Sequence, residues 1–287
     1  MRVHCGEGCV IIDRGGNAAH PSRIRVRKNV KECAAGKGAS AMRRAREETA
    51  KTARRGAAKS AGTRRTKKED MKYSLAVFDM DGTILDTLDD LTNTLNLSLE
   101  EAGLPLRTKD EVRSFVGNGV GKLIERALPE DTPETEREKF FEVFARNYKL
   151  HCADLTRPYD GVPELIAELR ARGVKTAVVS NKVDFAVRQL AEDYFPGLFD
   201  IAVGEREGVK RKPAPDSVFA VIDALGVRRE ETVYIGDSDV DVETAKNAGV
   251  DLIGVEWGFR PREVLLAHGA KVIVKRTDEL LRLILGE

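Results

Sequence analysis

The chain has 287 residues, of which 41% are hydrophobic and 33% are charged, as is usual for a globular protein. Its 48 basic and 47 acidic residues leave a formal net charge of +1. No apolar stretch approaches the ~20 residues of a membrane-spanning helix, and no secretory signal pattern follows the first residues. This argues against a membrane or secreted protein. Residues 71–287 contain a single cysteine, Cys152, which cannot form a disulfide within that part of the chain, so a reducing, cytoplasmic location is predicted.

Charge divides the chain into two unlike parts. Residues 1–70 hold 19 basic and 7 acidic residues, whereas residues 71–287 hold 29 basic and 40 acidic residues. The first part has almost no apolar periodicity, so it is predicted to be a disordered basic extension. It could bind nucleic acid through phosphate contacts, or act as a transit peptide. The favoured interpretation is an over-extended start with Met71 as the true one, because the first strand follows Met71 at once, and nucleic-acid binding is given little weight.

The second part opens with a short buried strand, Leu75 to Phe78, which is apolar and too short for a helix. The strand runs into Asp79-Met-Asp81-Gly-Thr. Two residues apart on extended backbone, the two carboxylates point the same way, which is costly unless a cation or a shared proton lies between them. Taken alone, the pair fits a helix-capping turn equally well.

Helical periodicity dominates the segment that follows. Helices are predicted at 87–101, 109–116, 120–128 and 134–150, and a turn cluster at 159–163 ends the series. Asp89 and Asp90 are interpreted as solvated charges on the first helix. The glycine-rich segment 117–122 is one residue short of a P-loop and is interpreted as a loop facing the site, with a plain interhelical turn as the alternative.

Strands and helices then alternate to the end of the chain. Strands are predicted at 174–179, 201–203, 232–235, 252–255 and 271–274, with helices at 163–172, 183–193, 215–225, 242–248 and 261–268 and at the end of the chain. This alternation predicts an α/β fold with a doubly wound, Rossmann-like parallel sheet. The predicted core comprises 71–86 and 159–287, and a smaller all-helical cap, 87–158, is inserted after the first strand.

Polar side chains follow two further strands. Ser180 and Asn181 come after the strand at 174–179, and Asp237 and Asp241 come after the strand at 232–235, with Lys212 between them in the chain. In a doubly wound sheet such loops converge on one edge. Carboxylate oxygens suit Mg²⁺, and hydroxyl, amide and ammonium groups suit a phosphate.

These four groups, in this order, resemble the short motifs of the haloacid dehalogenase superfamily phosphohydrolases, and the resemblance covers residues 73–287. Three stretches, Ser180-Asn181-Lys182, 236–249 and Phe115-Val-Gly-Asn-Gly119, are similar to the phosphoglycolate phosphatase group. The resemblance implies Mg²⁺-dependent hydrolysis of a small phosphorylated metabolite, with 2-phosphoglycolate as first choice, by a monomer or homodimer. Pyrophosphate hydrolysis and β-phosphoglucomutase-like phosphotransfer remain alternatives. Asp81 argues against the dehalogenases, transport ATPases and phosphonate hydrolases of the superfamily, the last despite Lys122 in the predicted cap.

The resemblance also implies a role for each motif residue. Asp79 would attack phosphorus and form an aspartyl-phosphate, and Asp81 would protonate the leaving oxygen and then deprotonate a water. The implied phosphate-binding residues are Gly82, Thr83, Ser180, Asn181 and Lys212. Lys212 would also restrain Asp79 as part of the catalytic machinery. The implied magnesium site comprises Asp79, the Asp81 carbonyl, Asp237 and, more as outer support, Asp241.

Overall fold

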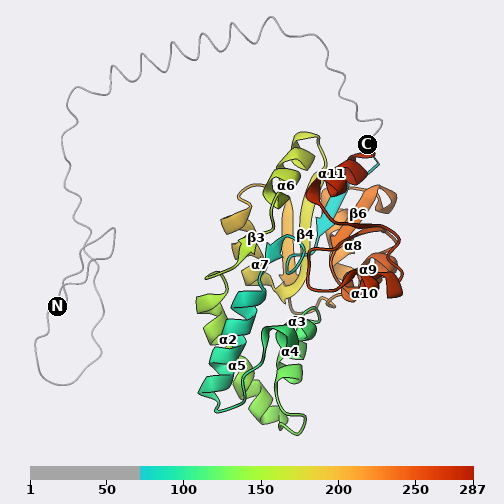
Figure 1. The fold of residues 1–287 in the computed structure, drawn as a ribbon. Coiled ribbons are helices and arrows are strands. Elements are labelled where there is room, and N and C mark those ends of the chain that lie inside the picture. Colours follow the sequence, from blue (N-terminus) through green and yellow to red (C-terminus); the bar gives the residue numbers. More distant parts are fainter. Residues whose placement is uncertain (1–71) are drawn as a thin grey trace, which may run out of the picture. The chain divides into compact units, whose positions relative to one another are not determined.

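A six-stranded parallel sheet forms the centre of residues 72–287, the part of the chain that this computed structural model describes (Figure 1). Its strands are Leu75–Phe78 (β1), Lys175–Val183 (β4), Ile201–Glu205 (β5), Thr232–Gly236 (β6), Asp251–Val255 (β7) and Ile273–Val274 (β8). Their order is β5-β4-β1-β6-β7-β8, which is the order of a Rossmann-type sheet and reverses between β1 and β6. The predicted fold class is confirmed. The predictions for 1–70 and for a start at Met71 lie outside the described residues.

The register of the sheet aligns the ends of its three central strands. Phe78, the last residue of β1, is paired with Val178 of β4 on one side and with Ile235 of β6 on the other. All four residues of β1 are buried, because strands cover both of its edges and helices cover both of its faces. The residues that follow these three positions therefore emerge together at the carboxyl edge of the sheet.

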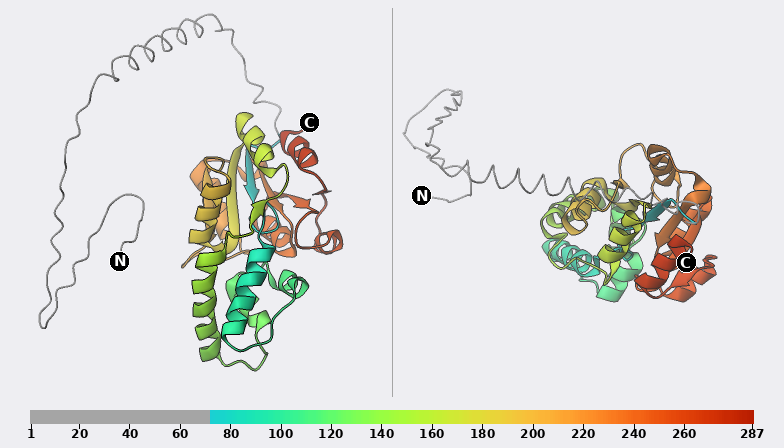
Figure 2. Two further views of the ribbon diagram at one scale, coloured as in Figure 1. Left: turned by 60° about the vertical axis from the view of Figure 1, so that its left-hand side comes forward. Right: turned by 90° about the horizontal axis from the view of Figure 1, so that it is seen from above.

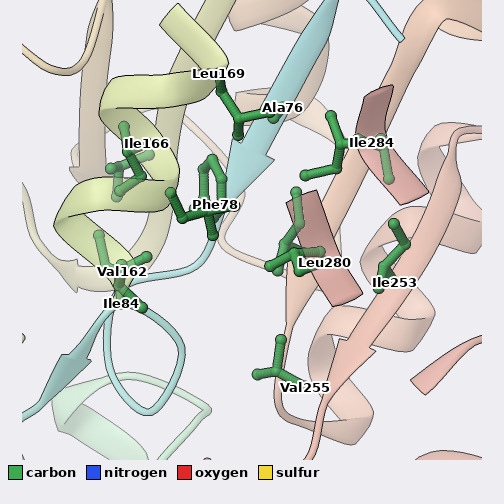
Figure 3. Packing of buried hydrophobic residues seen from close by; sticks show 14 of the residues in the cluster. Ala76, Phe78, Ile84, Val162, Ile166, Leu169, Ile253, Val255, Leu280 and Ile284 are labelled. Atoms are coloured by element: carbon green, nitrogen blue, oxygen red, sulfur yellow. The ribbon is translucent and has the colours of Figure 1, made fainter. Parts of the chain in front are cut away.

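Helices cover the sheet on both faces. They are Val162–Ala171 (α6), Asp184–Tyr194 (α7), Asp216–Leu225 (α8), Asp239–Ala248 (α9), Arg262–Ala267 (α10) and Thr277–Leu285 (α11), with a 3-10 turn at Arg229–Glu231. Ala76 and Phe78 of β1 join the apolar cluster of α6, α7 and α11, as Figure 3 shows in part. Leu75 and Val77 join the cluster of α8 and α9 on the other face. The alternation of strand side chains thus gives β1 a part in both cores.

Four helices are inserted between β1 and α6, as predicted. They are Leu88–Glu101 (α2), Lys109–Phe115 (α3), Val120–Ala127 (α4) and Glu134–His151 (α5). The chain leaves and returns through an antiparallel pair of two-residue strands, Leu85–Asp86 (β2) and Arg157–Pro158 (β3). The insert has an apolar cluster of its own, and α2 packs along α5 (Figure 2). The division into core and cap domains stays a prediction.

Two elements differ from their predicted limits in a way that matters for the site. β4 continues through Ser180 to Val183, beyond the predicted end at 179. α9 begins at Asp239 and not at 242, because Ser238 and Asp241 form a capping box. No helix in residues 72–287 is both long and apolar enough to cross a bilayer.

The interpretation of Asp90 as a solvated charge is wrong. Its side chain is buried in α2, and its carboxylate accepts hydrogen bonds from the backbone N–H groups of Leu155 (2.9 Å) and Thr156 (2.8 Å). Leu155 and Thr156 lie where the chain leaves the insert just before β3. Asp90 therefore fastens the returning chain to the first inserted helix. Its neighbour Asp89 is partly exposed and pairs with Lys109, as a solvated charge would.

Replacing Asp90 with alanine is expected to lower the free energy of unfolding by about 2–4 kcal/mol, because two buried N–H groups lose their acceptor. Urea unfolding of the full chain measures this loss. The matched control is Asp89→Ala, which removes an exposed ion pair and is expected to change stability by less than about 1 kcal/mol. Equal effects of the two substitutions would contradict the assigned role of Asp90.

Candidate active site

The carboxyl ends of β1, β4 and β6 open into one pocket, whose opposite wall comes from the inserted helices. The predicted site residues that line it are Asp79, Asp81, Ser180, Asn181, Lys212 and Asp237. The insert contributes mainly apolar side chains, namely Leu91, Val116, Val120, Leu123 and Tyr148. Polar groups thus converge on one side of the pocket and apolar groups enclose the other, as is typical of small-molecule sites.

Three buried carboxylates meet at the carboxyl edge of the sheet, and two of them, Asp79 and Asp237, line this pocket. Asp79, Asp237 and Asp241 each offer an oxygen, and these three oxygens lie within 4.8 Å of one another. Oδ1 of Asp79 lies 2.9 Å from the Lys212 ammonium but makes no hydrogen bond of good geometry among the described residues. A buried carboxylate oxygen without a hydrogen bond is costly. The donor set fits a hard divalent cation, which prefers oxygen ligands.

Two of these carboxyl groups hold protons more tightly than usual. Burial raises the pKa of Asp79 to about 7, although the nearby Lys212 opposes it. Burial, followed by the charges of Asp241 and Asp79, raises the pKa of Asp237 to about 8. A cation bound among these oxygens would lower both pKa values, because it favours the ionised carboxylates.

The surroundings of Asp237 fix its carboxylate in one orientation. Oδ1 accepts a hydrogen bond from Thr83 Oγ1 at 3.0 Å, and Oδ2 accepts one from the backbone N–H of Phe259 at 2.7 Å. A Cβ added at Gly82, where φ is +84°, or at Gly258 would lie 2.5 Å or less from an Asp237 side-chain atom. Neither glycine can be replaced without moving the carboxylate.

Gly82 and Thr83 are placed differently from the other predicted phosphate-binding residues. Neither is among the residues that line the pocket. The Thr83 hydroxyl is engaged by Asp237, and the Gly82 N–H donates to the Leu85 carbonyl at 2.9 Å. Both residues support the turn after β1, and their direct contact with phosphate stays a prediction.

Lys212 lies between Asp79, the candidate nucleophile, and the buried side chains of Asp241 and Tyr234. Its Nζ lies 2.9 Å from Asp79 Oδ1, donates to Asp241 Oδ1 at 2.8 Å, and donates to the Tyr234 hydroxyl at 3.0 Å. Burial by itself lowers the pKa of Lys212, but the charges of Asp241 and Asp79 outweigh it and hold the pKa well above its usual value. Lys212 is therefore a fixed positive charge beside Asp79.

Both oxygens of Asp241 are occupied by hydrogen bonds. Oδ1 accepts from Lys212 and, at 3.3 Å, from the Tyr234 hydroxyl. Oδ2 accepts from the hydroxyl and the N–H of Ser238, at 2.6 and 3.1 Å, and from the N–H of Asp237 at 3.2 Å. Asp241 is fully buried and does not line the pocket. This arrangement suits a residue that orients its neighbours better than a direct metal ligand.

Asn181 holds the Lys212 backbone and the inserted loop together. Its Oδ1 accepts from the Lys212 N–H at 2.8 Å, and its Nδ2 donates to the carbonyls of Lys212 and Gly117, both at 3.0 Å. Ser180 also lines the pocket, and its hydroxyl accepts from the Lys182 N–H at 3.3 Å. The side chain of Asn181 is thus structural, which leaves its main chain and the Ser180 side chain as the groups that face a ligand.

Asp81 has two polar neighbours, and neither of them is among the predicted site residues. Its Oδ1 accepts from the Thr87 hydroxyl at 2.8 Å and from Lys182 Nζ at 2.7 Å. The Lys182 side chain is 2% exposed and lies 5.2 Å from the centre of the Tyr148 ring of α5. Lys182 follows Ser180-Asn181 directly, so the two-residue period of a strand could have indicated it. Because the strand was predicted to end at 179, this period was not applied to Lys182.

The two ends of the glycine-rich segment 117–122 lie in different surroundings. Gly117 and Gly119 line the pocket, in agreement with a loop that faces the site. Lys122 lies outside the pocket and pairs with Glu125 on the same helix at 2.6 Å. The alternative role of Lys122 in covalent chemistry therefore has no geometric support.

Arg260, from the loop between β7 and α10, attaches the core to the insert. Its Nη1 donates to the carbonyl of Arg113 at 2.6 Å, and its Nη2 donates to the carbonyl of Val116 at 2.7 Å. The Ser114 carbonyl accepts a longer bond of 3.3 Å. Arg260 Nε also lies 3.5 Å from Oδ1 of Asp239. Sequence reasoning gave no indication of Arg260, because all these partners lie in other segments of the chain.

The chain is similar to known proteins. The sequence model of haloacid dehalogenase-like hydrolases matches residues 76–255. A phosphoglycolate phosphatase from Aquifex aeolicus is 33% identical over 64% of this chain and 84% of its own length. An N-acetylmuramic acid 6-phosphate phosphatase from Pseudomonas aeruginosa is 34% identical over 74% of this chain and 94% of its own.

A solved structure is also similar to this chain. The crystal structure of a candidate phosphoglycolate phosphatase from Lactobacillus delbrueckii subsp. bulgaricus is 44% identical and superposes with a TM-score of 0.73, covering 76% of this chain and 100% of its own. The sheet order, the motif residues at its carboxyl edge and these matches agree with one another. The chain belongs to the haloacid dehalogenase-like hydrolase family, and within it resembles the phosphoglycolate phosphatases.

Proposed function

We propose that the protein is a Mg²⁺-dependent phosphatase that hydrolyses 2-phosphoglycolate through an aspartyl-phosphate on Asp79. One observation carries the proposal: Asp79 lines a pocket together with a second carboxylate, Asp81, and a buried cation, Lys212, whose Nζ lies 2.9 Å from Asp79 Oδ1. A nucleophile, a proton carrier and a charge-neutralising group are the parts that phosphomonoester hydrolysis needs.

In the first step Asp79 attacks phosphorus. The bond from phosphorus to the ester oxygen breaks, and Asp81 gives its proton to that oxygen, so that the alcohol leaves and the phosphoryl group stays on Asp79. Lys212 neutralises charge on the phosphoryl oxygens and keeps Asp79 in place. Ser180 and the Asn181 main chain, in the pocket wall, supply further contacts to those oxygens.

In the second step a water molecule attacks phosphorus. Asp81 takes the proton of the water, the bond from phosphorus to Asp79 breaks, and inorganic phosphate leaves with Asp79 restored as a carboxylate. A divalent cation held by Asp79, Asp237 and the Asp81 carbonyl would screen the repulsion between the anionic nucleophile and the anionic phosphate. Hydrogen bonds from Thr83 and Phe259 orient Asp237 for this task.

The substrate assignment follows from the relatives and from the pocket. Phosphoglycolate phosphatases and an N-acetylmuramic acid 6-phosphate phosphatase match most of this chain, and both names describe phosphorylated acids. The wall that the insert contributes is mainly apolar, which suits a small leaving group better than a sugar rich in hydroxyls. Such metabolites occur in the cytoplasm, where Cys152 stays reduced.

A panel of phosphorylated compounds tests the assignment with the full chain and Mg²⁺. We expect kcat/KM for 2-phosphoglycolate to exceed that for pyrophosphate by at least about tenfold. Chelation of the metal with EDTA is expected to lower turnover at least about 100-fold, with recovery on addition of Mg²⁺. Activity on pyrophosphate alone, or conversion of β-glucose 1-phosphate in the presence of a bisphosphate, would replace the proposal with pyrophosphatase or mutase activity.

A further inference from the structure

The pocket contains a buried cation that the proposed mechanism does not use. Lys182 extends from β4 into the pocket, and its side chain is 2% exposed. Burial by itself lowers the pKa of Lys182, but the charge of Asp81 and the neighbouring Tyr148 outweigh it and raise the pKa above its usual value. A permanently charged ammonium group in an enclosed pocket is expensive to maintain unless it meets an anion.

The other two cations in the pocket wall are already committed. Lys212 donates hydrogen bonds to Asp241 and to the Tyr234 hydroxyl, and forms an ion pair with Asp79 at 2.9 Å. Arg260 donates to the main-chain carbonyls of the insert. Lys182 has Asp81 as its one carboxylate partner among the described residues, and Tyr148 lies beside it. It therefore retains capacity to bind an incoming anion.

The position of Lys182 matches the leaving-group side of the reaction. Lys212 is paired with Asp79, the nucleophile, whereas Lys182 is paired with Asp81, the residue that protonates the leaving oxygen. The remaining wall around it is apolar, with Leu91 and Leu123 from the insert. The pocket thus has one buried cation beside the phosphoryl group and a second beside the leaving group, so that it complements a molecule with two anionic groups.

We infer that Lys182 binds the carboxylate of the leaving group and so selects phosphorylated acids over neutral phosphomonoesters. This inference rests on the proposed function. The substrate carboxylate shares the ammonium group with Asp81, and the ring of Tyr148 lies beside it in the pocket wall. No new bond is made in this step; the interaction is an ion pair formed on binding and lost on product release.

The test compares 2-phosphoglycolate with 2-hydroxyethyl phosphate, which has the same carbon skeleton but no carboxylate. In the unmodified full chain we expect kcat/KM for the acid to exceed that for the neutral ester by about 10- to 100-fold. In Lys182→Met this ratio is expected to fall to near one, mainly through a higher KM for the acid. Any loss of Asp81 positioning affects both esters and cancels in the ratio.

Lys122→Met is the matched control, because it removes a lysine that lies outside the pocket and is expected to leave the ratio unchanged. A ratio in Lys182→Met that stays within about threefold of the unmodified value would overturn the inference. Should that variant not fold, equal kcat/KM values for the two esters in the unmodified protein would overturn it as well. Absence of turnover on both esters would instead reject the proposed function.

Discussion

Asp79→Asn is expected to lower the turnover of 2-phosphoglycolate at least about 10⁴-fold while the fold is retained. The amide has nearly the shape of the carboxylate but is a very poor nucleophile, so no phosphoryl group can be transferred to it. Because Asp79 is a buried group whose pKa burial raises to about 7, loss of its charge relieves repulsion with its acidic neighbours. The free energy of unfolding is therefore expected to stay the same or to rise slightly.

Phosphate release and thermal unfolding measure the two effects separately. Asp239→Asn is the control, since Asp239 lies in the motif that contains Asp237 but is absent from the pocket wall. Its turnover is expected to stay within about threefold of the unmodified value. A folded Asp79→Asn variant whose turnover falls by less than about 10²-fold would show that the assignment of the nucleophile is wrong. An unfolded variant would contradict the expected retention of the fold.

Lys212→Met is expected to affect stability and activity together. The substitution leaves the buried carboxylates of Asp79 and Asp241 without the ammonium group that lies 2.9 and 2.8 Å from them. Removing one partner of a buried ion pair typically costs about 3–5 kcal/mol of folding free energy. Turnover is expected to fall by at least about 10²- to 10³-fold, because one preorganised contact to the phosphoryl oxygens is lost.

Urea unfolding and phosphate release measure these losses. The control is Lys210→Met, which removes an exposed lysine two residues earlier and is expected to change stability by less than about 0.5 kcal/mol. Unchanged stability in Lys212→Met would mean that the two carboxylates take up protons at little cost, and that the buried ion pairs do not hold the site together.

Much of the fold and the position of the site could be predicted from local sequence. The apolar run of β1 is bounded and followed at once by two carboxylates, so one short stretch indicates both a central strand and the edge where ligands bind. Asp79, Asp81 and Asp237 follow their strands, and Ser180 lies in the last part of β4. The parallel register brings the four residues together.

What could not be predicted depends on contacts between distant segments. Asp90 has the spacing of an exposed helical residue, and only the return of the chain 65 residues later buries it. The hydrogen bond from the Thr83 hydroxyl to Asp237 depends on the loop after β6, so the sequence around Thr83 did not indicate it. Lys182 is part of the Ser180-Asn181-Lys182 stretch, but its contact with Asp81, 101 residues away, could not be read from that stretch.

The hydrogen bonds of Arg260 have a consequence for engineering. The last carbonyls of a helix have no partner within the helix itself, and α3 obtains part of its C-terminal cap from this guanidinium group of the core. The insert is thus not self-sufficient at this end. Grafting residues 87–158 onto a related core should succeed only where that core supplies an arginine at the equivalent place, and exchange of the amide hydrogens of α3 should quicken where it does not.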